Sequence, residues 1–270
     1  MNNLQRALAP IPGAAWTAID DEAKRTLKVA LAGRQIADFD GPLGWQHAAV
    51  TLGRTMPLSR APGAGVAAAL RRVQPLVEIR VPFELVREEL EAHERGAKDA
   101  DLGPVTDAAR TIAAAEDNAI FQGYPDAHIE GICSAASGAA LTITEDYEAY
   151  PGVAANALSR LRNAGIGGPY AIALGPKCHM GLLQTTLRGG FPVIQHVQRL
   201  IDGPVIWAPA LNGAVVVSLR GGDFELTVGR DLSIGYTSHT ATTVELYLEE
   251  SFTFRLLTPE AAVPLVYGAS

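Results

Sequence analysis

Cysteine and histidine stand side by side at Cys178 and His179, and a thiol with an imidazole base is the pair used by cysteine hydrolases. Adjacent residues on one helix point about 100° apart, so these two cannot form a dyad with each other. A second histidine would have to approach the thiol from elsewhere, and the candidates are His128, His196 and His239. The Gly-x-Ser-x-Gly motif of serine hydrolases is missing from the sequence. A cysteine or serine hydrolase therefore remains an alternative, but the sequence identifies no set of catalytic residues for it.

The other residues with metal-binding or acid–base chemistry form no local motif. The six histidines lack the His-x-His, His-x-x-x-His and Glu-x-x-His spacings that bring ligands together, so no metal site is predicted. Glu116 and Asp117 are adjacent in a predicted helix, where their carboxylates diverge. We expect both to be solvated or to form ion pairs between subunits. Cys133 and Cys178 stand in no Cys-x-x-Cys pattern, which indicates free thiols in the reducing cytoplasm.

Two glycine-rich segments suggest ligand loops, but their context favours turns. The segment GIGGPY at 165–170 follows a predicted helix and precedes a predicted strand, the reverse of a dinucleotide fingerprint. In RGGDFEL at 220–226, we expect a β-hairpin turn in which Gly221 and Gly222 take positive φ and Asp223 bonds its own backbone. Neither segment predicts a nucleotide or metal site.

Composition limits the class of protein. The chain has 270 residues, 48% hydrophobic and 19% charged, which excludes intrinsic disorder. No apolar run reaches the roughly 18–20 residues of a membrane span, and the N-terminus does not resemble a secretory signal. A net charge of −7 argues against binding of nucleic acid through a basic surface. We therefore expect a folded protein with neither a membrane nor a nucleic-acid partner.

Hydrophobic periodicity indicates a mixture of helices and strands. The helices are predicted at 17–33, 87–97, 104–121, 151–164, 177–187 and 193–203. The strands are predicted at 75–86, 170–175, 204–208, 213–219, 223–229, 244–257 and 263–267. Residues 51–74 are rich in Pro and Gly, and with the strand at 75–86 they suggest a long two-stranded arm. Such an arm is unstable alone and is expected to lie on a partner.

Nine stretches along the chain, in this order and spacing, resemble the family 1 encapsulin shell proteins, also called linocin or bacteriocin-like culture-filtrate antigens. They occupy residues 8–28, 31–46, 73–85, 94–102, 115–124, 168–176, 189–203, 220–236 and 250–265. The resemblance implies an α+β fold like that of tailed-phage major capsid proteins. It implies an N-terminal helix and the start of a peripheral domain at 1–48, an extended arm at 49–85, the peripheral domain with its long helix at 86–130, an axial domain at 131–225, and a return to the peripheral domain with the C-terminal strands at 226–270.

The function implied by this resemblance is structural. About sixty copies would form a closed icosahedral nanocompartment, and the subunit itself would not be an enzyme. The shell would enclose a cargo enzyme, a dye-decolorising peroxidase or a ferritin-like iron oxidase, held by a C-terminal targeting peptide. A prophage-derived capsid protein remains an alternative, although the acidic charge argues against packaging of nucleic acid.

The resemblance also carries functional positions. In GRQIADF and RDLSIGY, it places the cargo-peptide groove at Arg34, Ile36, Asp38, Asp231, Leu232 and Ile234. For any one of these residues, ordinary packing or ion pairing within the subunit is the alternative role. A loop that lines a five-fold pore would contain Thr186, Leu187, Arg188, Gly189, Gly190 and Phe191, and a solvent-exposed surface loop is the alternative there.

Two departures from related proteins limit what is carried over. Some family members bind flavin through a tryptophan at the position of Glu88, so no flavin or other cofactor is predicted here. Some phage relatives crosslink through an arm lysine, but residues 29–97 contain no lysine, so a non-covalent shell is expected. The small-residue segments at 63–70 and 111–120 are expected to face neighbouring subunits.

Overall fold

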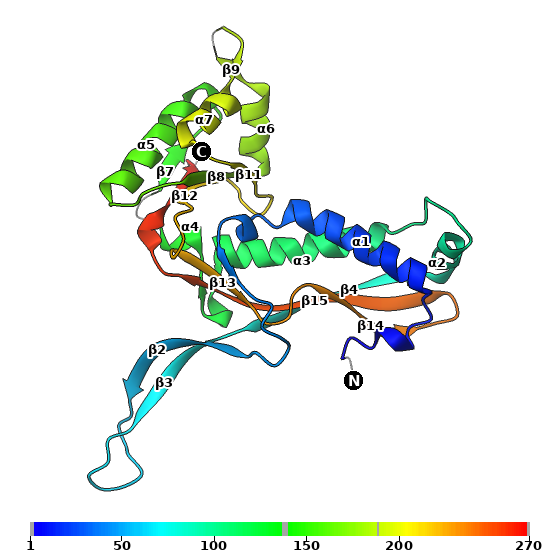
Figure 1. The fold of residues 1–270 in the computed structure, drawn as a ribbon. Coiled ribbons are helices and arrows are strands. Elements are labelled where there is room, and N and C mark those ends of the chain that lie inside the picture. The colour runs from blue at the N-terminus through cyan, green and yellow to red at the C-terminus, as the bar shows by residue number, and fades with distance from the viewer. Residues whose placement is uncertain (1–2, 137–139, 188, 269–270) are drawn as a thin grey trace.

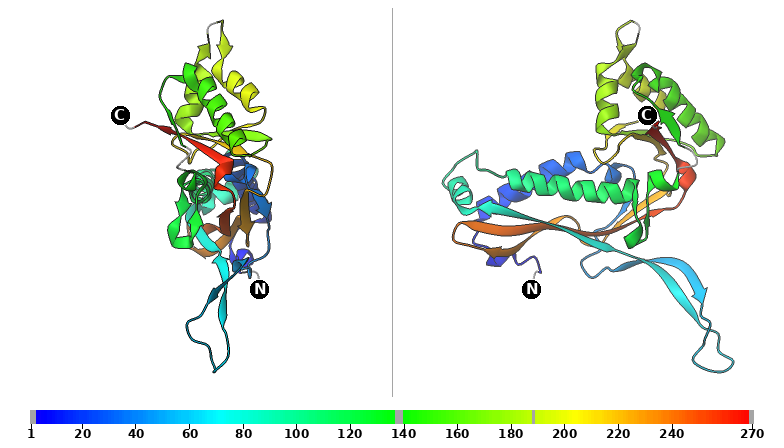
Figure 2. Two further views of the ribbon diagram at one scale, coloured as in Figure 1. Left: turned by 90° about the vertical axis from the view of Figure 1, so that its left-hand side faces the viewer. Right: turned by 180° about the vertical axis from the view of Figure 1, so that it is seen from behind.

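The computed structural model describes residues 3–136, 140–187 and 189–268. These residues form a long unit of helices on a sheet, a second unit of sheet and helices above one end of it, and a projecting hairpin (Figure 1). Figure 2 shows the same three parts from the side and from behind. We call them the lower unit, the upper unit and the arm. The helices and mixed sheets confirm the predicted α+β class.

The lower unit contains a five-stranded sheet in which β15 is central. Strand β15 pairs antiparallel with β4, β13 and β14, and β1 extends the sheet by pairing parallel with β13. The strands are β1 (Asp38–Asp40), β4 (Val77–Val86), β13 (Phe224–Val228), β14 (Ser233–His239) and β15 (Thr243–Leu256). The predicted strand at 244–257 is confirmed as β15, whereas β14 was not predicted from periodicity.

Two long helices cover one face of this sheet, α1 (Gly13–Ala30) and α3 (Gly103–Phe121) (Figure 1). Apolar residues recur every four positions along α1, at Ile19, Ala23 and Leu27, and these side chains are buried against α3 and the sheet. The first helix begins at Gly13, four residues earlier than predicted, because the extended Pro12 precedes it. A short helix, α2 (Arg87–Glu94), follows β4 directly.

The long helix α3 confirms the prediction for 104–121, but its orientation corrects two expectations. Glu116 and Asp117 are fully buried, so the prediction that they are solvated or pair between subunits was wrong. Within the small-residue segment 111–120, Ala115 is exposed. Most of segment 111–120 packs inside its own chain, with Ile112, Ala113, Ala119 and Ile120 in the core. This segment therefore does not supply a small-residue surface for neighbouring subunits.

The upper unit has a five-stranded sheet in the order β11-β8-β12-β16-β7. Its strands are β7 (Leu141–Ile143), β8 (Tyr170–Leu174), β11 (Val205–Trp207), β12 (Ala214–Ser218) and β16 (Ala262–Tyr267). Helices α5 (Tyr150–Asn163), α6 (Pro176–Gln184) and α7 (Val193–Ile201) pack beside this sheet (Figure 1). All five residues of β8 are buried, as its continuous apolar run predicts. The predicted helices and strands of this region are confirmed to within a few residues.

Short elements lie between or before the longer helices and strands. They are the single-turn helices Arg6–Leu8, Gly33–Gln35, Pro125–Ala127, Tyr147–Ala149 and Pro259–Ala261, the helix α4 (Ile132–Ala135), and the paired strands β5 (Gly123–Tyr124) and β6 (Ile129–Glu130). The helical turn Gly33–Gln35 follows α1 and lies against the end of α3.

The arm is a hairpin of β2 (Ala49–Pro57) and β3 (Ala69–Pro75), and most of its side chains are exposed. The strand predicted at 75–86 exists as β4, but its expected pairing within the arm was wrong, because it pairs with β15 in the lower unit. The cause is its alternating pattern: Val77, Ile79 and Val81 turn one apolar face towards the core. The proposed division of the chain into five segments stays a prediction.

The two glycine-rich segments are turns, with one difference from expectation. Residues 165–170 join α5 to β8, as predicted. Gly221 and Gly222 take φ of 82° and 77°, as predicted, but β12 and β13 on either side belong to different sheets and form no hairpin. The Asp223 carboxylate accepts hydrogen bonds from Arg220, and the Gly222 N–H donates to Asp38. The expected bond of Asp223 to its own backbone was wrong, because a guanidinium three residues away is the stronger donor.

Candidate functional site

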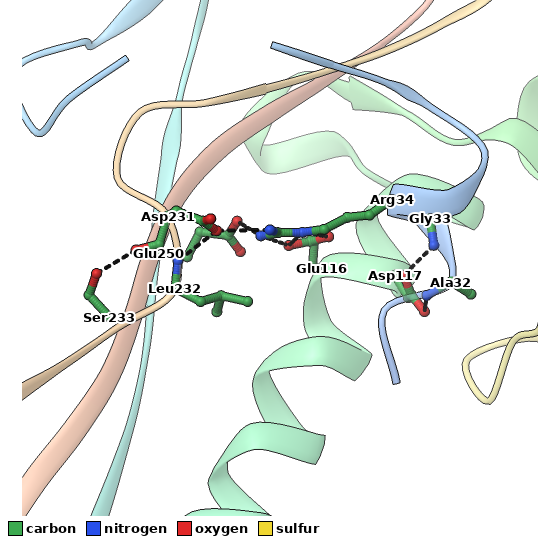
Figure 3. A network of polar contacts seen from close by, with 9 residues as sticks. All are labelled: Ala32, Gly33, Arg34, Glu116, Asp117, Asp231, Leu232, Ser233 and Glu250. Atoms are coloured by element: carbon green, nitrogen blue, oxygen red, sulfur yellow. Dashed lines mark hydrogen bonds and ion pairs between the residues drawn. The ribbon is translucent and has the colours of Figure 1, made fainter. Parts of the chain in front are cut away.

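Arg34 and Asp231, two of the predicted groove residues, are in direct contact. Arg34 lies on the helical turn Gly33–Gln35 that follows α1, and Asp231 lies in the turn between β13 and β14. Arg34 Nη1 donates to Asp231 Oδ1 over 2.8 Å, as Figure 3 shows. The Asp231 side chain is 42% exposed, so this ion pair lies at the surface.

The remainder of the Arg34 guanidinium points inward, to Glu116 of α3 and Glu250 of β15 (Figure 3). Arg34 Nε and Nη2 bond the Glu116 carboxylate at 3.0 and 2.8 Å, and Nη2 bonds Glu250 Oε1 at 2.5 Å. Burial alone would lower the pKa of Arg34, but the hydrogen bonds and charges of these acids raise its pKa above the ordinary value. The arginine therefore stays charged while it joins a surface turn to two buried carboxyl groups.

Asp117, beside Glu116, bonds the backbone of the same turn. Its two carboxylate oxygens accept hydrogen bonds from the Ala32 and Gly33 N–H groups at 3.0 and 2.8 Å (Figure 3). Burial raises the pKa of Asp117 to about 7, and these two backbone bonds oppose the rise. The adjacent acids diverge as predicted, yet both position residues 32–34. Adjacent acids on a helix do not reveal this positioning role. Their partners, the Arg34 side chain and the Ala32 and Gly33 backbone, lie more than eighty positions away in the sequence.

The other predicted groove residues are placed differently. Ile36 and Ile234 are 6% and 3% exposed, and they pack in two different clusters of the core. Leu232 is half-buried, and its N–H donates to Asp231 Oδ1 at 2.8 Å. Asp38 is exposed and accepts the Gly222 N–H at 2.6 Å. The structure thus brings Arg34, Asp231 and Leu232 together and uses the two isoleucines for packing.

Two exposed aromatic rings, which were not singled out from the sequence, lie beside arginines of this region. The Arg34 guanidinium lies 5.3 Å from the ring of Phe39, and that of Arg230 lies 5.5 Å from the ring of Trp45. Phe39 is 42% exposed and Trp45 is 56% exposed. Arg34 bonds Glu250 whereas Arg230 bonds the adjacent Glu249, so Phe39 is the ring that lies beside the Arg34–Asp231 pair.

The predicted pore loop lies at the outer end of the upper unit (Figure 1). Its stem is the short antiparallel pair β9 (Thr186–Leu187) and β10 (Phe191–Pro192). Gly189 and Gly190 take φ of 101° and 80° at the turn, a backbone region that favours glycine. Thr186 is exposed and Phe191 half-buried, and Arg188 lies outside the described residues.

The hydrolase alternative finds no support in the surroundings of its cysteines. Cys178 is buried, and its Sγ lies 3.3 Å from both the Tyr150 and the Tyr267 hydroxyl groups. His179 instead packs edge-on against Trp207. Burial raises the pKa of the Cys133 thiol to about 12, which leaves it protonated and unreactive.

Within the described ranges, no three histidine, cysteine, aspartate or glutamate side chains lie close enough to hold a metal ion. In the same ranges, no helix is long and apolar enough to cross a membrane.

Comparison with known proteins gives a consistent result. A family model described as "Encapsulating protein for peroxidase" matches residues 1–253. A type 1 encapsulin shell protein of Rhodospirillum rubrum is 55% identical over 270 residues, which cover 98% of this chain and 96% of that protein.

Solved structures show the same architecture at low sequence identity. A virus-like particle protein from Pyrococcus furiosus matches with a TM-score of 0.63 at 14% identity and covers 92% of this chain and 97% of its own. A capsid protein of the myovirus XM1 matches with a TM-score of 0.54 at 10% identity, over 88% and 92% of the two chains. These likenesses confirm the capsid-like fold.

Proposed function

Because this chain belongs to the family of encapsulin shell proteins, we propose that its copies form a closed icosahedral particle of about sixty subunits around a cargo enzyme. The protein is a shell-forming subunit of a nanocompartment. Its particle size, its cargo, a location in the cytoplasm and the lack of catalysis by the subunit are parts of the proposal.

The observation that carries the proposal is the arm. Its strands β2 and β3 pair only with each other among the described residues, and an isolated two-stranded hairpin has little stability in water. Five apolar side chains along it are between 46% and 55% exposed, namely Met56, Leu58, Val66, Leu70 and Val73. Exposed apolar surface of this kind marks a contact with another chain. A neighbouring subunit that covers the arm would bury it.

Contacts of this type join different surfaces of identical subunits, and they close into a finite particle when the rotation between subunits is that of a point group. Electron microscopy of the purified protein tests the proposal. We expect uniform closed particles, and a monodisperse monomer or dimer would contradict it.

We further propose that the targeting peptide of the cargo docks beside Arg34 and Asp231. The support is the surface ion pair at 2.8 Å with the exposed ring of Phe39 beside Arg34. The matching family is described as an encapsulating protein for peroxidase, which favours a peroxidase as cargo over a ferritin-like iron oxidase.

Mass spectrometry of proteins that co-purify inside the particles would identify the cargo, and a synthetic copy of its C-terminal peptide can then be titrated onto empty particles. Phe39→Ala should weaken binding about tenfold, as loss of an aromatic anchor does. Met180→Ala is the control, because Met180 is 59% exposed but lies in the upper unit. Equal binding by both variants would remove Phe39 from the docking surface.

The loop Thr186–Phe191 is proposed to line a pore, where Gly189 and Gly190 would let several copies approach closely. No flavin and no nucleic acid are part of the proposed particle, since Glu88 replaces the flavin tryptophan and the net charge is −7. The prophage capsid alternative rests on the fold alone, because the phage structures share 14% identity or less with this chain.

A further inference from the structure

The Arg34 network contains more acid than base. The part of the chain that the structure describes places three fully buried carboxyl groups, from Glu116, Asp117 and Glu250, at or beside one guanidinium. The carboxylate of Asp231 adds a fourth acid at the surface end of Arg34. Ionised carboxylates are costly to bury without a compensating charge, so all of these groups cannot be charged together.

Glu250 is the group that lacks partners. Its Oε1 bonds Arg34, but its Oε2 is buried and receives no hydrogen bond from a donor in the described ranges. Glu116, in contrast, accepts hydrogen bonds from Arg34 at both oxygens, and Asp117 accepts two backbone N–H groups. A proton on Glu250 Oε2 would turn an unsatisfied acceptor into a donor for the neighbouring carboxylate of Glu116.

We propose that Glu250 carries a proton at neutral pH and shares it with Glu116, and that this pair positions Arg34 so that Nη1 reaches Asp231 at the surface. Glu250 and Glu116 are positioning residues for the Arg34–Asp231 pair. The biological role of this positioning rests on the proposed function, in which the cargo peptide docks at that pair. The proton pair itself can be tested without any cargo.

The charges around Glu250 agree with this assignment. Burial raises its pKa well above the ordinary range, repulsion by Glu116 and Asp231 raises the pKa further, and only Arg34 lowers it. The neighbouring strand adds no charge on this face, because Ile79 of β4 is the register partner of Glu250. Asp117, beyond Glu116, adds one more acid on the side of α3.

Loss of the shared proton would place a second negative charge under Arg34. The guanidinium would then be drawn towards Glu116 and Glu250, and Asp231 would be repelled. The surface pair therefore opens as the pH rises. If opening of the Arg34–Asp231 pair releases one proton, the fraction of molecules with an open pair increases up to about tenfold for each pH unit. This holds at pH values below the pKa of the Glu116–Glu250 pair.

Infrared spectroscopy of the purified, full-length protein tests the proton directly. At pH 7, ordinary carboxyl groups are ionised, and Asp117, with its pKa of about 7, contributes a partial band of its own. We expect the absorption band of protonated carboxyl groups to be weaker in Glu250→Gln than in the wild type. Glu249→Gln is the matched control, since Glu249 is the adjacent buried residue and bonds Arg80 and Arg230. The control should keep the band.

Hydrogen–deuterium exchange tests the positioning role. The Leu232 amide donates to Asp231 Oδ1, so exchange of residues 231–236 reports on opening of the surface turn. After correction for intrinsic exchange, protection in the wild type should fall with rising pH, and in Glu250→Gln the fall should be abolished. Glu116→Gln provides a second variant if Glu250→Gln does not fold, and it should likewise flatten the profile.

An equally strong infrared band in the wild type and Glu250→Gln at pH 7, or the same pH profile in the wild type and the folded variants, would overturn the proposal. Failure of the protein to form particles would count against the shell, but not against the proton pair, because the band is also measured in unassembled protein.

Discussion

Glu249 and Glu250 are neighbours on β15, but their carboxyl groups lie on opposite faces of the sheet in opposite charge surroundings. Glu249 receives hydrogen bonds from two arginines, Arg80 and Arg230, each at 2.6 Å. Glu250 shares the single guanidinium of Arg34 with Glu116 and Asp231. Side chains alternate between the two faces of a strand. Glu249 therefore has an excess of positive charge around it, whereas Glu250, one residue later, has an excess of negative charge around it.

Glu249→Gln should destabilise the protein. The amide keeps the shape of the side chain but removes the charge that balances Arg80 and Arg230, at a cost of about 2–3 kcal/mol. The loss is measured as a lower midpoint of unfolding in guanidinium chloride. Glu225→Gln serves as the control, because its ion pair with Arg255 is partly solvent-exposed and should cost less than about 1 kcal/mol. Equal losses in both variants would contradict the assignment of Glu249 as a buried ionised group.

Asp117 should make stability depend on pH. Burial raises its pKa from an ordinary 3.8 to about 7, so the folded protein holds this proton more tightly than the unfolded chain. Its stabilising contribution is complete below about pH 4 and is lost as the pH rises through 7. Asp117→Asn cannot titrate, and the decline in stability between these pH values should become shallower. Unfolding at a series of pH values measures it, with Asp107→Asn, an exposed acid on the same helix, as the control. An unchanged slope in Asp117→Asn would assign the proton to another group.

A side chain at position 33 should clash with the side chain of Ile120. A Cβ at position 33 would lie 2.5 Å from Ile120 Cδ1 and 3.1 Å from Asp117 Oδ1. Gly33→Ala should therefore cost about 1–3 kcal/mol, and adding Ile120→Val, which removes Cδ1, should restore part of the loss. Thermal unfolding of the single and double variants measures the coupling between the two sites. At Gly13 nothing lies within 4 Å of an added Cβ, so Gly13→Ala is the matched control.

Assembly should depend on one face of the arm. Met56 and Leu70 are register partners on β2 and β3, and they are 49% and 55% exposed in the single chain. Asp at both positions should leave the subunit folded but prevent particle formation, because charge would be buried against the neighbour.

Light scattering measures assembly, and circular dichroism checks the fold. The control is Thr55→Asp, one residue from Met56 on the other face of the hairpin and paired with Arg71. Particles of normal size from the Met56→Asp, Leu70→Asp variant would show that this face is not an interface.

Elements with a strong period could be predicted from the sequence. The apolar spacing of α3 and the alternation of β4 and β15 locate these elements to within a few residues. The pattern of β4 also identifies its buried face, but it does not specify which strand pairs with it, and the pairing with β15 joins residues more than 150 positions apart. Pairing over such a distance depends on the whole fold.

The site was predictable only in part. Resemblance assigned Arg34 and Asp231 to one groove, and the structure shows them in contact although they lie 197 positions apart, while their role in docking stays a prediction. It gave no signal for Glu116 and Glu250, because a buried acid and a solvated acid look alike in sequence until the cation that accompanies them is known. Arg34 is that cation, and its role becomes visible only when α3 and β15 are brought together.

The positions of β15 and β16 have a consequence for synthesis on the ribosome. In the lower unit, β4, β13 and β14 each pair with β15, and in the upper unit β16 lies between β12 and β7. Both sheets thus depend on residues beyond position 242, which leave the exit tunnel after the strands with which they pair. A nascent chain can form α1 and α3 but can complete neither sheet, so subunits become competent to associate only after translation of these strands is complete. Incomplete chains on neighbouring ribosomes should therefore not associate with one another before β15 and β16 are made.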